Sequence, residues 1–144
     1  MRARPLVVPC SDLGQRYYET GSSNDLPGQL LYSCNSPLYP RLTQEVDDNG
    51  TAAQARSRFT SAIANIYTAT DGWYEVASPG PAGSRAFKRS RGGGLNTQIA
   101  MLTTKWQYYV DLLLTYAPGD DGYPGFTPQW AATVLNRLLA RIPG

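Results

Sequence analysis

The chain has 144 residues, of which 42% are apolar and 17% charged, and its formal net charge is +2. This length and composition fit a single globular domain covering residues 1–144, and so small a charge does not by itself indicate nucleic-acid binding. The sequence contains no histidine, which excludes Ser-His-Asp and Cys-His catalytic sites and removes the usual zinc and iron ligands, so we expect no enzyme, no metal and no cofactor.

The N-terminal segment and the two cysteines bear on where the protein is made. No apolar run reaches the roughly 18 residues that cross a bilayer, and the apolar stretch at residues 6–8 is too short for a signal peptide. We therefore expect synthesis and retention in a cytoplasm, without membrane contact. Cys10 and Cys34 stand in no CxxC spacing. Two separate, buried or half-buried thiols are expected, and a disulfide formed after release from the cell is the alternative.

The first predicted elements are two short strands, at residues 15–20 and 29–34, separated by a turn-rich stretch. Strands divided by Gly, Pro, Asn and Asp residues are typical of a β-hairpin. Residues 35–50 contain two prolines and end in the acidic sequence Asp47-Asp48-Asn49-Gly50. This composition predicts an irregular connection that ends in a turn.

Residues 58–78 allow two interpretations. Asp71-Gly72 lies between two β-favouring runs, and Asp-Gly is typical of the type I′ turn that joins paired strands, so a second hairpin is the preferred prediction. The competing prediction is a helix over residues 51–67, supported by apolar side chains at helical spacing. These side chains are Phe59, Ile63 and Ile66.

Residues 79–94 are predicted to form a long loop that carries a local concentration of positive charge. Four cations lie within seven positions, and they are either solvated charges or contacts to a polyanion. The glycines at 92–94 lack the GxxxxGK[ST] order of a phosphate-binding loop, so no nucleotide site or small-molecule substrate is predicted. The four cations are Arg85, Lys88, Arg89 and Arg91.

Residues 95–117 are ambiguous in the same way as 58–78. Apolar residues recur there at intervals of three and four, which favours an amphipathic helix. The part from 105 to 116 is also an aromatic and aliphatic run whose side chains would alternate between the two faces of a strand. Periodicity alone favours the helix, through Ile99, Leu102, Trp106, Tyr109, Leu113 and Tyr116.

The last element is predicted to be a helix over residues 127–142. Thr127 can cap its beginning, Pro128 suits the first turn, and Arg141 complements the C-terminal end of the helix dipole. A helix of this length is marginal in isolation, so its apolar face must dock on its own domain or on a partner. That face consists of Trp130, Val134, Leu135, Leu138, Leu139 and Ile142.

The C-terminal part, with the run Lys105-Trp-Gln-Tyr-Tyr-Val-Asp-Leu-Leu-Leu-Thr-Tyr116, a turn, and the leucine-rich helix after it, resembles the coat proteins of single-stranded RNA bacteriophages. The similarity is one of order and pattern over roughly 40 residues, and it requires residues 105–116 to be a strand. The longer turn before the helix, the irregular residues 35–56 and the basic loop depart from the family's pattern.

The resemblance implies an α+β fold: an antiparallel β-sheet with an N-terminal hairpin and a C-terminal α-helix, interlocked with a second copy as a dimer. It further implies a viral capsid subunit that self-assembles into a shell in the bacterial host cytoplasm, becomes part of the virion, and binds genomic RNA on its inner sheet surface. Tyr108 matches a tyrosine on which an RNA base can stack, and Thr60 falls near a hydroxyl that reaches a base. Lys88, Arg89 and Arg91 are candidates for phosphate contact. The helix residues Trp130, Val134, Leu135, Leu138 and Leu139 are the expected packing and dimer contacts.

Two other functions compete with the coat protein. A mostly α-helical adaptor or scaffold subunit of a virion or other complex would contain helices near 51–67, 95–117 and 127–142. A small secreted toxin or nuclease would depend on acidic residues and arginines in place of histidine, with Asp111 or Glu75 as the residue to test.

Overall fold

A computed structural model describes residues 6–13, 17–23, 28–36, 39–90, 97–116 and 128–143. It confirms the α+β class, because a seven-stranded sheet is combined with two α-helices. None of the helices in these ranges is long and apolar enough to cross a membrane. In chain order the elements are η1 (Cys10–Leu13), β1 (Tyr18–Ser23), β2 (Gln29–Ser36), β3 (Tyr39–Asp48), α1 (Ala52–Asn65), η2 (Ala69–Asp71), β4 (Tyr74–Val76), β5 (Arg85–Ser90), β6 (Thr97–Lys105), β7 (Tyr108–Tyr116) and α2 (Pro128–Arg141).

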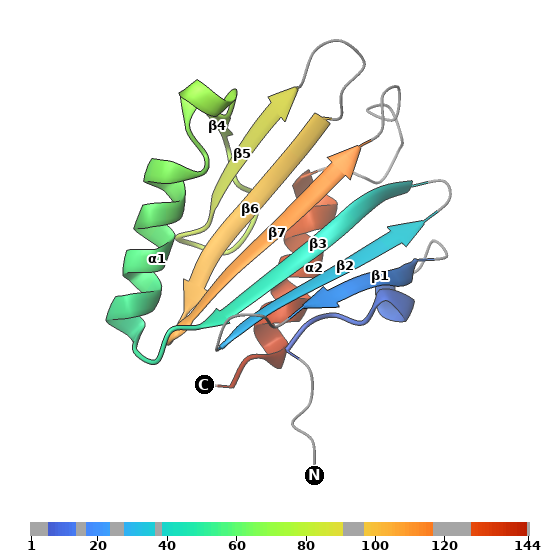
Figure 1. Ribbon diagram of the computed structural model, residues 1–144, viewed down its shortest axis with the longest axis horizontal. Coiled ribbons are helices and arrows are strands. Elements are labelled where there is room, and N and C mark those ends of the chain that lie inside the picture. The colour runs from blue at the N-terminus through green and yellow to red at the C-terminus, as the bar shows by residue number, and fades with distance from the viewer. Residues whose placement is uncertain are drawn as a thin grey trace.

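The sheet is built from two consecutive antiparallel meanders. Its strand order is β1-β2-β3-β7-β6-β5-β4, so β1–β3 form one half and β4–β7 the other. The two halves meet in a single ladder between β3 and β7, which runs from the pair Arg41 and Thr115 to the pair Asp48 and Tyr108. The two helices lie on opposite sides of this sheet (Figure 1).

Two separate cores follow from the alternation of side chains along the strands. Val110 and Leu112 of β7 point to the side covered by α2, whereas Tyr109 points to the side covered by α1. We use "α1 layer" for the smaller core, between α1 and the sheet, and "α2 layer" for the larger one. The α1 layer consists of Ala62, Tyr67, Trp73, Phe87, Ala100, Leu102 and Tyr109.

The N-terminal hairpin is confirmed, since β1 and β2 pair over most of their length. The irregular connection predicted for residues 35–50 is wrong, because most of it forms the long central strand β3. Its side chains alternate as a strand requires: Leu42, Gln44 and Val46 are buried in the α2 layer or beside it, and Thr43 and Glu45 are half-buried on the other face.

The hairpin predicted for residues 58–78 is also wrong, and the competing helix is correct. Thr51 is the N-cap of α1, and its hydroxyl accepts a hydrogen bond of 3.1 Å from the backbone N–H of Gln54. Asp71-Gly72 does form a turn, with Gly72 at a φ of +87°. That turn closes the short helix η2 before β4 and does not join two long strands.

Residues 95–117 form two strands where helical periodicity favoured one helix. β6 and β7 are joined by the two residues Trp106 and Gln107 and pair along their whole length. Both strands place apolar residues on both faces of the sheet, so these residues match a helical spacing by coincidence. The strand that the coat-protein resemblance requires, residues 105–116, is therefore confirmed for Tyr108–Tyr116.

The long loop predicted for residues 79–94 is wrong for residues 85–90, which form β5. Arg91 lies outside the described residues. The C-terminal helix is confirmed from Pro128 to Arg141, and its expected cap Thr127 lies outside the described residues. Cys10 and Cys34 form a disulfide, so the expectation of two separate thiols is wrong.

Candidate functional site

The residues predicted to bind RNA do not share one surface. Thr60 is exposed on the outer side of α1. Tyr108 is partly buried against the α2 layer, on the other side of the sheet. Lys88 lies beside Ile99 and Gln129 on that same side, and its neighbour on β5, Arg89, points toward the α1 layer.

Arg89 is held within the chain. Its Nε donates to Oε1 of Gln98 at 2.8 Å, and its Nη1 donates to the carbonyl of Asp71 at 3.2 Å. Its guanidinium lies 4.5 Å from the centre of the Trp73 ring. These contacts give Arg89 a structural role at the edge of the α1 layer.

The apolar face of α2 packs on the chain's own sheet. Leu135 and Leu138 are fully buried, and the ring of Trp130 stacks on that of Tyr17 with 6.1 Å between the centroids. Lys105 fixes the end of the helix, because its Nζ donates to the carbonyl of Leu139 at 2.8 Å. Most of this face is therefore covered within the chain itself. The five expected contact residues, Trp130, Val134, Leu135, Leu138 and Leu139, all pack within one chain.

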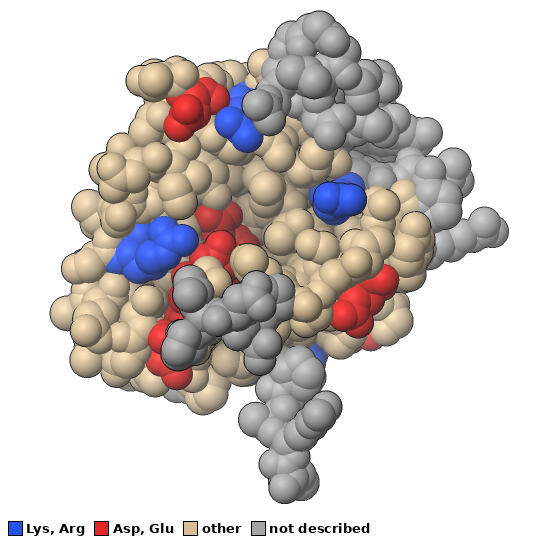
Figure 2. All heavy atoms as spheres, viewed as in Figure 1, with Lys and Arg blue, Asp and Glu red and all other residues tan. Residues whose placement is uncertain are grey.

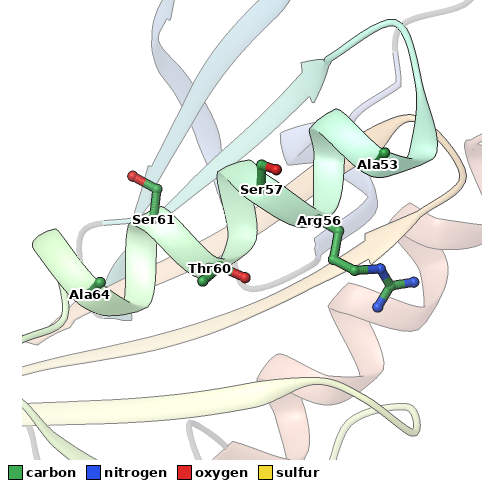
Figure 3. Close-up of a pocket in the computed structure, with 6 residues that line it drawn as sticks. All are labelled: Ala53, Arg56, Ser57, Thr60, Ser61 and Ala64. Atoms are coloured by element: carbon green, nitrogen blue, oxygen red, sulfur yellow. The ribbon is translucent and has the colours of Figure 1, made fainter.

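The outer face of α1 forms a shallow, open hollow of about 570 Å³ (Figure 3). Arg56 extends its guanidinium away from the helix there, and the side chain of Thr60 lies one turn further along the same face. A guanidinium and hydroxyl groups are suited to phosphate and ribose oxygens. The lining residues are Ala53, Arg56, Ser57, Thr60, Ser61 and Ala64.

The inner side of α1 covers a cluster of charged and phenolic side chains. The β3–β7 register places Glu45 opposite Asp111, and Asp47 opposite Tyr109. From α1, the side chain of Arg58 contacts Glu45 and Asp47. In Figure 2 acidic atoms lie set back from the surface beside this helix. We call this group the Arg58 cluster, and it consists of Arg58, Glu45, Asp47, Tyr67, Tyr109 and Asp111.

Arg58 ties the cluster together. Its Nη2 donates to Oε2 of Glu45 at 3.1 Å, and its Nε lies 3.4 Å from Oδ2 of Asp47. Its guanidinium also lies 4.5 Å from the centre of the Tyr109 ring. One cation thus makes two ion pairs and a cation–π contact between α1 and the sheet.

Asp111 is the most enclosed acid of the cluster. The hydroxyls of Tyr67 and Tyr109 both donate to its Oδ2, the second at 2.7 Å. Among the described residues, neither Oδ1 of Asp111 nor Oδ1 of Asp47 has a hydrogen-bond partner. A buried carboxylate oxygen without a partner disfavours the ionised form.

The protonation of the cluster follows from this burial. Loss of hydration raises the pKa of Asp111 to about 7, even though the two tyrosine hydroxyls favour its ionised form. Burial, and next the neighbouring carboxylate of Glu45, raise the pKa of Asp47 to about 7. Burial also raises the pKa of Tyr67 and of Tyr109, which keeps both phenols protonated at neutral pH.

The described part of the chain has no group of three acidic or cysteine side chains that could hold a metal ion. Glu75, the other acid considered for nuclease chemistry, lies on the edge strand β4 and pairs with Arg85 through a 2.7 Å hydrogen bond. Since β5 and β6 separate β4 from β7, the structure does not bring Glu75 and Asp111 together.

Sequence reasoning missed this cluster. The local sequence places Asp47 in a turn and Glu45 in an irregular connection, so neither is predicted to face a sheet. The available signal was Asp111 itself, a lone acid within the apolar run at 108–114. A charge at a position that must be buried indicates a partner elsewhere in the chain.

No family model, no curated protein and no solved structure matches this chain.

Proposed function

We propose that the protein is a structural subunit of a viral coat, which assembles with copies of itself around RNA. The observation that carries this proposal is the extended conformation of Tyr108–Tyr116, followed by the leucine-rich helix α2. This is the order of elements that the resemblance to coat proteins of single-stranded RNA bacteriophages requires. The mostly helical fold that the adaptor alternative assumes is not found in the described residues, because β6 and β7 occupy the region of its central helix.

The proposed contact between subunits is an edge of the sheet. β7 is paired on both sides, so the sheets of two subunits can join only through β1 or β4. Edge strands present unpaired backbone groups that pair readily with a second chain. Tyr18 on β1 and Tyr74 on β4 are 51% and 52% exposed. We assign the contact to β1, because its six residues offer a longer ladder than the three of β4.

The proposed RNA contact is the outer face of α1, where Arg56 and Thr60 lie together. The cations visible on that face of the molecule are separate from one another and interspersed with acids (Figure 2). Binding by such a surface uses few phosphate contacts, so its salt dependence should be shallow. RNA would be retained mainly through the many copies in an assembled particle.

Expression of the chain alone, followed by electron microscopy and nuclease treatment, tests the proposal. We expect regular particles that contain nuclease-protected RNA. Tyr18→Lys should reduce the product to small species, because a charge on the edge opposes strand pairing. Tyr74→Lys, the matched control on the opposite edge, should leave the particles intact. Wild-type protein that stays monomeric at every concentration contradicts the coat function, and the reverse behaviour of the two variants contradicts the assignment to β1.

The RNA contact is tested separately. Arg56→Gln should yield particles with less protected RNA, whereas Arg41→Gln, which removes an exposed arginine on β3, should package as the wild type does. Equal packaging by both variants would contradict the assignment of RNA to the outer face of α1.

A further inference from the structure

Polar contacts contribute to the attachment of α1 to the sheet. The only fully buried side chains of this helix are the small ones of Ala55 and Ala62. Phe59 and Ile63 are only partly buried against the α1 layer. Since the stabilisation from apolar burial scales with the area removed from water, two alanines contribute little. Arg58 is therefore a principal anchor of the helix.

The charges beneath the helix are unbalanced. Arg58 is the one cation of the cluster, and it faces three carboxyl groups: Glu45, Asp47 and Asp111. Asp47 and Asp111 are each only 6% exposed. If all three acids were ionised, the cluster would hold two uncompensated negative charges in a largely dehydrated space. Such an arrangement is strongly unfavourable, and protons are the simplest way to relieve it.

The neighbouring elements offer no further compensation. From β6, the uncharged Ala100 and Leu102 face the α1 layer. From β5, Arg85 and Arg89 point to the same side, but Arg85 pairs with Glu75 and Arg89 lies over Trp73. On β2, the residue opposite Glu45 is Leu31 and the residue opposite Asp47 is Gln29, and neither titrates.

We propose that Asp47, Asp111 and Arg58 form a proton-dependent latch. When the two aspartates are protonated, the charge of Arg58 is balanced by Glu45 and α1 stays on the sheet; when they ionise, the excess negative charge loosens it. The latch acts in the pH interval between the ordinary aspartate pKa, 3.8, and about 7. In that interval the docked state binds more protons than the opened state, so docking weakens as the pH rises and levels off above about 7.

Opening is expected to be local. The α2 layer lies on the other side of the sheet and shares none of its buried residues with the α1 layer. The disulfide between Cys10 and Cys34 also lies outside the α1 layer. Release of α1 would therefore uncover Trp73 and Phe87 while the sheet and α2 stay folded. The latch does not rest on the proposed coat function.

Amide hydrogen exchange of the intact protein, measured peptide by peptide from pH 5 to pH 8 and corrected for the intrinsic exchange rate, tests the latch. Protection of α1 should fall as the pH rises to about 7, by up to roughly ten-fold per pH unit for each aspartate, and then stay constant. Protection of β2, β3 and α2 should change much less. The double variant Asp47→Asn/Asp111→Asn should show α1 protection that is independent of pH.

Glu75→Gln is the matched control, because it removes an exposed carboxylate outside the cluster. It should keep the wild-type pH dependence. If the double variant does not fold, Asp47→Asn alone should reduce the slope. Carboxyl carbon chemical shifts of the wild type give an independent measurement. Ordinary pKa values for both aspartates, or wild-type α1 protection that does not vary with pH, would overturn the proposal.

Discussion

The side chain of Gln44 holds the backbone of Val8 by two hydrogen bonds. Its Oε1 accepts from the N–H of Val8, and its Nε2 donates to the carbonyl of the same residue, both at 2.8 Å. Gln44 is fully buried in the middle of β3. The buried carboxamide thus satisfies both backbone polar groups of Val8 and attaches the N-terminal segment to the face of the sheet.

Replacement of Gln44 should be severely destabilising. Gln44→Met keeps the shape of the side chain but leaves a buried N–H and a buried carbonyl without partners, which should lower the free energy of unfolding by about 2 to 5 kcal/mol. Urea denaturation measures this loss. Gln129→Met, at an exposed position of α2, should change stability by less than about 0.5 kcal/mol. Similar effects of the two substitutions would show that the Val8 contacts carry little energy.

Reduction of the disulfide should also lower stability. The bond joins residues that are 24 positions apart, and closing a loop of that size in the unfolded chain is worth about 3 kcal/mol. We expect a clear drop in the melting temperature when a thiol reductant is present, and the same drop in Cys10→Ser/Cys34→Ser without reductant. A reductant effect that persists in the double serine variant would mean that another process is being measured.

Lys105 should stabilise the end of α2. Its Nζ donates to the carbonyls of Leu139 and Ile142, at 2.8 and 3.2 Å, and places a positive charge at the negative end of the helix dipole. Lys105→Met should cost about 1 kcal/mol and increase hydrogen exchange in the last turn of α2. Lys88→Met, on β5, should leave that turn unchanged. Unaltered exchange in Lys105→Met would contradict the capping role.

Global stability should depend on pH through Asp111 and Asp47. Their pKa values are raised to about 7 in the folded state, so the folded protein binds more protons than the unfolded chain between about pH 4 and 7. The free energy of unfolding should therefore fall as the pH rises through that interval, by at most about 1.4 kcal/mol per pH unit for each group, and then level off. Chemical denaturation at a series of pH values measures this slope. Asp111→Asn should roughly halve it, and an unchanged slope would contradict the assignment.

Trp106 should be a strained position. It is the one residue other than glycine with a positive φ in the described part of the chain, at 54°, and its side chain is 61% exposed. Glycine adopts such a conformation without steric cost, whereas alanine does not. Trp106→Gly should therefore be more stable than Trp106→Ala by about 1 kcal/mol in urea denaturation. Equal stability of the two variants would show that the turn relaxes when the indole is removed.

Local signals in the sequence were sufficient for the N-terminal hairpin and for α2. The turn-rich residues between the first two strands, and Pro128 with the apolar face behind it, determine those elements without help from the rest of the chain. β3 is not predicted from the sequence because Pro40 and the buried Gln44 obscure the alternation that marks a strand. α1 is the less favoured prediction because it buries alanines in place of large apolar residues, so only Phe59, Ile63 and Ile66 indicate a helix.

The Arg58 cluster required information that no short stretch of sequence contains. Glu45 and Asp111 become neighbours only because β3 pairs with β7, and the register of that pairing depends on the whole sheet. The same holds for Cys10 and Cys34, whose spacing in sequence does not reveal that their Cα atoms lie 5.5 Å apart. Such contacts depend on the tertiary structure, so they cannot be predicted from local periodicity.

The single ladder between β3 and β7 also has a consequence for biosynthesis. On the ribosome, β3 is made first, and all of α1, β4, β5 and β6 must follow before β7 emerges. Until then the nascent chain presents Leu42 and Val46 next to an unpaired edge, which is a surface that attracts chaperones and other unfinished chains. Fragments that stop short of Tyr108 should accordingly aggregate, even though the first three strands are complete in them.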